Sequence, residues 1–152
     1  MKKFLSLLLS VLALLVITAC DFNKPTIEDS GKITVVVAEE TPLVYELSLD
    51  DLDLSQGALS VLLHIKETKG LDVVYEESTY GAYLTKVGAL APDSNGFVSI
   101  FTSYEPNWDQ TAFAQTRYHG EIKVVSSAVG LSSMSIVDGV VIYIGYVAYS
   151  NE

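Results

Sequence analysis

Alternating hydrophobic and polar positions predict that a folded domain begins with two consecutive strands. Residues 33–38 form an almost continuous apolar run, and a turn signal containing Pro42 follows it. Over residues 43–50, apolar side chains then alternate with polar ones. This period of two is typical of a strand with one buried and one solvated face. We therefore expect a hairpin whose second strand has one face toward water.

The spacing of apolar positions changes to that of a helix over residues 55–69. Ser55 is the expected cap at the start, and Gly70 is the expected stop. The apolar side chains that form a broad surface on this segment are Leu59, Val61, Leu62, Leu63 and Ile65. Because this surface must be buried, we expect the helix to pack across the sheet.

Further strands are expected along the rest of the chain. They cover residues 71–75, 83–87, 97–102 and 140–149. Turn signals occur at residues 92–96, 119–120 and 138–139. The last strand is apolar on both faces, as is typical of a central strand buried between layers. Residues 103–130 mix aromatic and polar side chains without a clear period, and residues 126–135 are rich in small side chains.

This order of elements predicts an α+β fold. A hairpin, one helix and several later strands favour a β-grasp-like mixed sheet with the helix packed on one face. An all-β sandwich is the alternative, and the helix at residues 55–69 distinguishes the two.

The first twenty residues predict secretion and lipid attachment. Lys2 and Lys3 precede an uncharged apolar stretch that ends in Ile-Thr-Ala-Cys at Cys20. This is the pattern of a lipoprotein signal peptide, and the stretch is too short for a stable spanning helix. A diacylglyceryl group on Cys20 would be a sufficient membrane anchor, because stable attachment takes more than one acyl chain. We expect a signal peptide at residues 1–19, the lipidated cysteine and a polar tether at 20–32, and one domain at 33–152.

The charge of the mature chain argues against nucleic acid as a partner. Removing Lys2 and Lys3 from the 9 basic residues leaves 7 against 19 acidic ones, a net charge of −12. Phosphate backbones are neutralised by clustered lysine and arginine, and anionic lipid headgroups would also be repelled. No cysteine follows Cys20, so disulfides and thiolate metal sites are not expected.

No catalytic or metal-binding constellation is evident. The two histidines are His64, among leucines on the predicted helix, and His119, in a predicted turn. Neither lies in a nucleophile motif. The segment starting at Asp51 has the alternating oxygens of a calcium loop, but Gln56 and Leu62 occupy the positions that need glycine and glutamate. We therefore expect neither an enzyme nor a metal site.

Aromatic residues are dense in the middle of the mature chain. They are Tyr75, Tyr80, Tyr83, Phe97, Phe101, Tyr104, Trp108, Phe113 and Tyr118. Rings with polar tips near loops form good platforms for flat or apolar ligands, although rings on strands also fill cores. Phe97 and Phe101 suit either role equally. We select Tyr80, Tyr83, Tyr104 and Trp108 as candidate ligand-binding residues.

The most distinctive block in the domain is YGAYLTKV at residues 80–87. With it, the sequence resembles the transcobalamin C-terminal-like domain family, which has no known function and occurs in many bacterial lipoproteins. The other segments that carry the resemblance are residues 33–49, 70–75, 95–97, 101–103, 111–114, 118–120 and 137–139. The resemblance implies a β-grasp-like sheet with one helix, in agreement with the pattern.

The resemblance also implies a binding role. In animal cobalamin carriers, the similar small domain covers one face of cobalamin together with a helical domain, for which this chain has no room. We expect a membrane-anchored extracytoplasmic lipoprotein whose non-catalytic domain binds a cobalamin-like or other flat small molecule, or a surface partner. The alternative is a structural or adhesive cell-surface protein that acts through protein–protein contacts.

Overall fold

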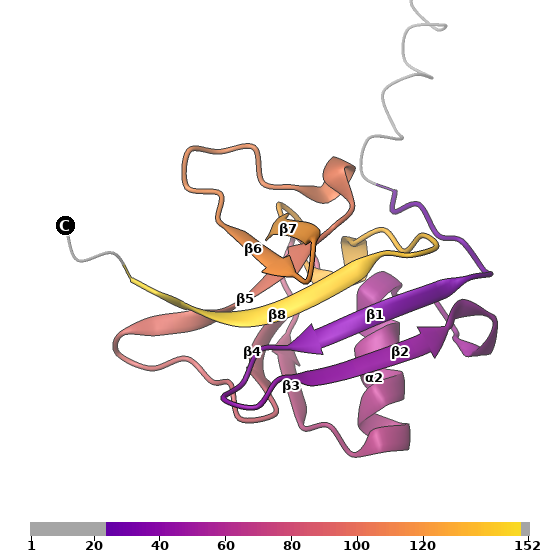
Figure 1. Cartoon of the computed structure of the whole chain (residues 1–152), viewed down its shortest axis with the longest axis horizontal. Helices are drawn as coiled ribbons and strands as arrows, with labels where there is room; N and C mark the ends of the chain where they lie inside the picture. The colour runs from indigo at the N-terminus through magenta and orange to yellow at the C-terminus, as the bar shows by residue number, and fades with distance from the viewer. Residues whose placement is uncertain (1–23, 150–152) are drawn as a thin grey trace, which may run out of the picture.

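A six-stranded mixed sheet forms the centre of the structure, a computed structural model that describes residues 24–149 (Figure 1). Its strand order is β2-β1-β8-β5-β7-β6, and β3 and β4 pair separately. The strands are β1 (Lys32–Val37), β2 (Leu43–Ser48), β3 (Val73–Glu76), β4 (Tyr83–Val87), β5 (Gly96–Thr102), β6 (Thr116–His119), β7 (Ile122–Ser126) and β8 (Val141–Ala148). The helix is α2 (Gly57–Lys69), and the 3-10 turns are η1 (Leu49–Asp51), η2 (Glu105–Asn107) and η3 (Leu131–Ser133).

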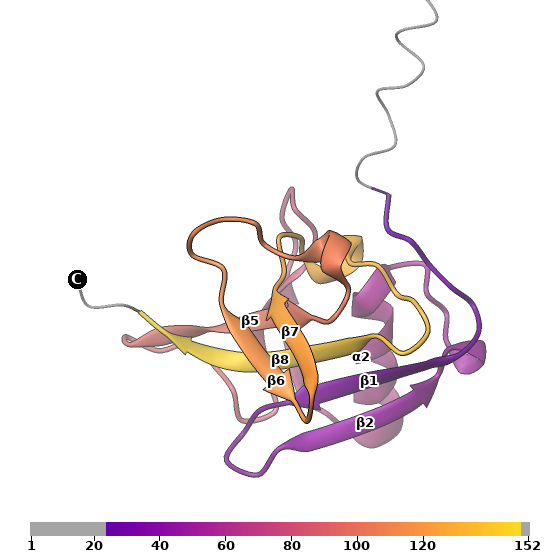
Figure 2. The same ribbon diagram turned by 45° about the horizontal axis from the view of Figure 1, so that its top comes forward.

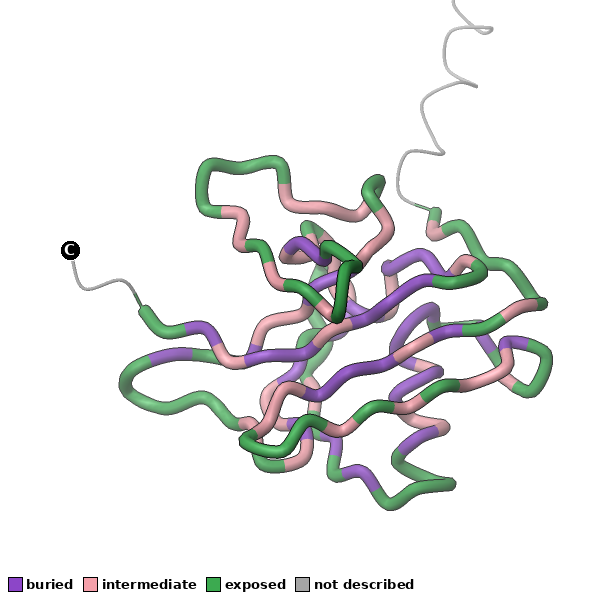
Figure 3. Tube along the Cα trace, viewed as in Figure 1, coloured by how far each residue is buried: buried purple, intermediate pink, exposed green. Residues whose placement is uncertain are grey.

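The predicted central strand is confirmed. β8 pairs in parallel with β1 and antiparallel with β5, so it has hydrogen-bonded neighbours on both sides. Buried side chains alternate between its two faces, with Val141 on one and Ile142 on the other. Figure 3 shows the resulting buried stretch along β8 and β1.

The predicted helix is also confirmed, and it places the fold in the α+β class. In Figure 1, α2 crosses one face of the main sheet behind β1 and β2. The main core lies between these layers, where Leu59, Leu62 and Ile65 are fully buried together with Ile33 and Ile144. The helix ends at Gly70, whose left-handed backbone closes the last turn, as the sequence predicts.

A smaller cluster covers the other face of the sheet. Phe101 is fully buried in it, with Val36 and Val141 packed nearby. Arg117 on β6 lies over the Phe101 ring, with its guanidinium carbon 5.4 Å from the ring centroid. The β6–β7 hairpin therefore belongs to this second cluster, and Figure 2 shows the hairpin in front of the sheet.

The expected cap at Ser55 is wrong. The helix begins at Gly57, its cap position is Gln56, and no side chain caps it. The Ser55 amide instead donates to Asp53 Oδ1 at 2.9 Å. Gly57 has a φ of +53°, and a Cβ there would lie 2.7 Å from the Met134 carbonyl oxygen, so this first helical position requires glycine.

Residues 103–130 contain two strands that the pattern did not reveal. β6 and β7 form a hairpin, and the turn predicted at His119-Gly120 lies at its tip. The chain also contacts the domain before residue 33, within the range expected to be a tether. The Glu28 amide donates to the Ile136 carbonyl at 2.8 Å, and the Ile136 amide donates to the Thr26 carbonyl at 2.8 Å.

Candidate ligand-binding groove

Two adjoining pockets form a groove on either side of Tyr80. They have volumes of about 490 and 370 Å³ and share Tyr80, Ala128 and Val129 in their walls. Both volumes fall within the range of small-molecule sites. The Tyr80 side chain is 77% exposed, so its ring is available from both sides.

The groove is built where the loop before β4 crosses the segment before η3. The Gly130 amide donates to the Tyr80 carbonyl, and the Leu131 amide donates to the Ala82 carbonyl, both at 2.7 Å. A Cβ at residue 130 would lie 2.6 Å from the carbonyl carbon of Gly81. Only a glycine there permits so close a backbone crossing. The backbone that carries Tyr80 is therefore held in place without the use of its ring.

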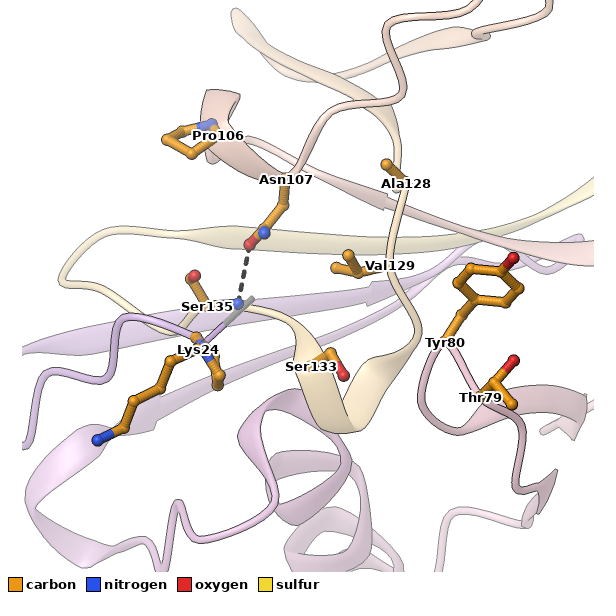
Figure 4. Close-up of a pocket in the computed structure, with 10 residues that line it drawn as sticks. Lys24, Thr79, Tyr80, Pro106, Asn107, Ala128, Val129, Ser133 and Ser135 are labelled. Atoms are coloured by element: carbon orange, nitrogen blue, oxygen red, sulfur yellow. Dashed lines mark hydrogen bonds between the residues drawn. The ribbon is translucent and has the colours of Figure 1, made fainter. Parts of the chain in front are cut away.

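The first pocket has a polar lining. The Ser135 amide donates to Asn107 Oδ1 at 2.8 Å, and the Thr26 amide donates to Ser135 Oγ at 3.0 Å. These bonds join η2, the segment before β8 and the start of the described chain. In Figure 4, Lys24 and Tyr80 lie on opposite sides of the lining residues. The pocket thus offers amide and hydroxyl groups to a polar ligand group, while the Lys24 side chain points away from the other lining residues.

The second pocket is largely apolar and lies between β4 and β5. Its walls include Tyr83, Leu84, Phe97 and Ile100. The Tyr83 hydroxyl donates to Glu76 Oε2 at 2.5 Å, which orients the ring. This hydrogen bond to a carboxylate raises the pKa of the Tyr83 hydroxyl. An apolar surface framed by two rings suits a flat ligand.

The structure divides the four predicted site residues into two pairs. Tyr80 and Tyr83 line the same pocket, whereas Tyr104 and Trp108 line neither pocket of the groove. Tyr104 packs half-buried against the main core. Trp108 Nε1 donates to the Thr102 carbonyl at 2.8 Å, and Lys123 Nζ lies 4.7 Å from the Trp108 ring centroid.

Sequence reasoning missed the wall opposite Tyr80. That wall comes from Asn107 and from residues 127–135, a segment noted only for its small side chains. Small residues next to a distinctive loop indicate close backbone packing. Such a signal could have suggested that this segment meets the Tyr80 loop.

No obvious reaction centre accompanies the groove. Within residues 24–149, no group of three or more His, Cys, Asp and Glu side chains could hold a metal ion. His64 lies with Asp53 and Glu67 in a separate cleft beside α2, and His119 is on β6. No helix in the described part of the chain is long and apolar enough to cross a membrane.

Comparison with known proteins gives a structural likeness only. The sequence matches no protein-family model and no curated protein. Its fold is similar to part of haptocorrin, solved in complex with Cbi. The TM-score is 0.54 at 13% sequence identity, and the match covers 79% of this chain but 25% of the haptocorrin chain.

A second solved structure is a putative metal binding protein from Ruminococcus gnavus. The match has a TM-score of 0.47 and 18% identity, and it covers 81% of this chain and 100% of that one. At these identities the likeness concerns the fold alone. The chain spans about a quarter of haptocorrin, so the shared unit is one small domain of a larger protein.

Proposed function

We propose that this chain is an extracytoplasmic lipoprotein, anchored through Cys20, whose domain binds a small molecule without chemical conversion. We further propose that the domain is a β-grasp-like member of the transcobalamin C-terminal-like family. The lipobox pattern at Cys20 supports the anchor. The parallel pairing of β1 and β8 beside a single helix, and the likeness to haptocorrin, support the family.

The groove around Tyr80 carries the binding proposal. An apolar pocket framed by Tyr83 and Phe97 adjoins a polar pocket containing Asn107. A ligand that suits both is a flat, mainly apolar molecule with polar groups along one edge. Corrinoids are flat macrocycles with amide groups around the ring, and haptocorrin was solved with Cbi. We therefore choose a corrinoid as the first probe.

Thermal unfolding of the mature chain carrying Cys20→Ser tests this proposal. A ligand at 100 times its Kd stabilises the folded state by about 2.7 kcal/mol. We expect cobinamide, haem or another flat cofactor to raise the Tm, and Tyr80→Ala to abolish the rise.

Tyr118→Ala is the matched control, because Tyr118 is 63% exposed on β6 and lines neither pocket. Its Tm response should equal that of the parent. Equal responses of the Tyr80 and Tyr118 variants would place the ligand elsewhere. No response to any flat molecule would contradict small-molecule binding in the groove.

One observation favours the alternative of protein–protein contact. β2 is one of the two outer strands of the main sheet, with Val44 exposed on it. Exposed sheet edges can pair with strands of other chains, but the exposed charge of Glu46 in the same strand opposes this. Glu46→Thr should increase self-association in sedimentation if this edge can pair. An unchanged sedimentation profile would count against the alternative.

A further inference from the structure

Phe113 is the most exposed large hydrophobic side chain in residues 24–149. Its side chain is 88% exposed, although the loop that carries it is well organised. The Asp109 amide donates to the Ser126 carbonyl at 2.8 Å, and the Gln115 amide donates to Ser126 Oγ at 3.0 Å. Both ends of the loop are therefore fixed to β7.

Hydrogen bonds between residues close in sequence also shape the tip of this loop. The Thr111 amide and hydroxyl both donate to the Asp109 carboxylate, at 2.8 and 3.0 Å. The Phe113 amide donates to Thr111 Oγ1 at 3.3 Å. Moving such a ring from water into an apolar environment is favourable, so the loop presents Phe113 in a form that an apolar surface could bind.

The loop projects on the side of the domain where the described chain begins. Lys24 and Pro25 share a pocket with Pro106 and Asn107 of η2, which leads directly into the loop. Figures 1 and 2 both show the start of the described chain and the loop rising from this side of the sheet. Cys20 precedes Lys24 by four residues, which can span about 14 Å at most.

We propose that this loop contacts the bilayer that holds the anchor, with the Phe113 ring in the headgroup interface. The proposal rests on the proposed lipidation of Cys20. A single phenylalanine binds membranes weakly, but the anchor makes the contact intramolecular and so raises its effective concentration. Zwitterionic lipid is the expected surface, because the acidic chain would be repelled by anionic headgroups.

Fluorescence quenching of the lipidated protein in phosphatidylcholine vesicles tests the contact between the loop and the bilayer. The only native cysteine is acylated, so Ala112→Cys provides a unique thiol for an environment-sensitive fluorophore beside Phe113. Lys69→Cys provides the control label, at the exposed end of α2 that Figure 1 places away from the loop. We expect spin-labelled phosphatidylcholine to quench the label at residue 112 but not the label at residue 69.

Adding Phe113→Ser to the Ala112→Cys chain should abolish the quenching and leave flotation with vesicles unchanged. If the protein floats with vesicles but the labels at residues 112 and 69 are quenched equally, the bilayer contact is wrong and the anchor still stands. The loop would then face the medium. Chain that fails to float would overturn both proposals. Circular dichroism should show the same fold in every variant, because Phe113 is almost fully exposed.

Discussion

The crossing of Gly81 and Gly130 is the residue-scale feature that creates the groove. Gly81 has a φ of +99°, and the Gly130 position is closed by the backbone of residues 81 and 82. No hydrophobic pattern reveals such a contact, because glycine contributes neither polarity nor period. The distinctive YGAYLTKV block marks one side of the crossing, and the small residues around Gly130 form the other.

We predict that Gly130→Ala separates these segments. A Cβ would lie 2.7 Å from the Ala82 carbonyl oxygen, and overpacking of this kind destabilises proteins by about 1–3 kcal/mol. Hydrogen exchange at the amides of residues 130 and 131 should accelerate, because the added methyl group would strain their hydrogen bonds to the Tyr80 and Ala82 carbonyls. Gly120→Ala is a control for strain away from the crossing: its φ of +59° disfavours alanine, but no atom lies within 4 Å of a Cβ there, so the bonds of residues 130 and 131 should be unaffected. Unchanged exchange in Gly130→Ala would contradict the close crossing.

Tyr146 and Asp93 give a residue-scale pH prediction. The Tyr146 hydroxyl donates to Asp93, which raises the pKa of Tyr146 to about 12 and lowers the pKa of Asp93. Tyrosine in the unfolded chain has a pKa of about 10. The contribution of Tyr146 to stability is therefore fully present below pH 10 and is lost as the pH rises through 12. For Asp93 the contribution is lost as the pH falls through its lowered pKa.

Ultraviolet absorbance of tyrosinate during an alkaline titration measures this shift. Tyr146→Phe should remove the component that titrates near pH 12, whereas Tyr118→Phe should leave it in place. The difference in stability between the parent and Tyr146→Phe should also shrink above pH 10. The pKa of Tyr83 is raised as well, so only a late component that is undiminished in Tyr146→Phe would assign the shift to another tyrosine.

At the scale of elements, the sequence predicted those whose apolar pattern is strong. α2, β1 and β8 contribute many buried side chains, and burial imposes the periods by which helices and strands are recognised. In the first half of β2, half-buried apolar side chains alternate with exposed ones, which gives the same period of two. β6 is only four residues long, and its half-buried side chains are those of Arg117 and His119, so no apolar period marks it. The start of α2 was misplaced because no side chain caps it, and because the helix begins at a glycine that lies too close to the Met134 carbonyl for a Cβ, a contact distant in sequence.

The buried face of α2 gives the element-scale prediction. Leu59 is fully buried in the main core, whereas Leu63 on the same helix is only half-buried at its margin. Leu59→Ala should lower the free energy of unfolding by about 2–5 kcal/mol, because it leaves a cavity. Leu63→Ala removes the same atoms with the same change in helix propensity, and it should lower the free energy of unfolding by clearly less. Urea unfolding of both variants measures the difference, and equal losses would contradict the packing described.

At the scale of the whole molecule, the first described residues after the proposed anchor line the groove. Lys24, four residues after Cys20, lines the same pocket as Tyr80. An anchored domain would therefore hold this pocket near the membrane surface. The lining of the candidate groove could be predicted only in part: Tyr80 and Tyr83 line it, while Tyr104 and Trp108 lie outside it, in packing and hydrogen bonding. Whether any of the four binds a ligand stays a prediction.

The proposed lipid anchor at Cys20 leads to a prediction at the scale of the whole molecule. Cys20→Ser removes the thiol that would carry the diacylglyceryl group, and one peptide segment alone lacks the apolar area for stable attachment. In a bacterial host, the parent chain should partition with membranes and incorporate labelled fatty acid, whereas the variant should do neither and appear in soluble extracytoplasmic fractions.

Asn23→Ser, close to the same site, is a control that should retain both properties. Fatty-acid labelling that persists in Cys20→Ser would contradict acylation at this residue. Labelling of neither chain would leave the domain a secreted binder, and the Phe113 loop would then have no anchored bilayer to contact.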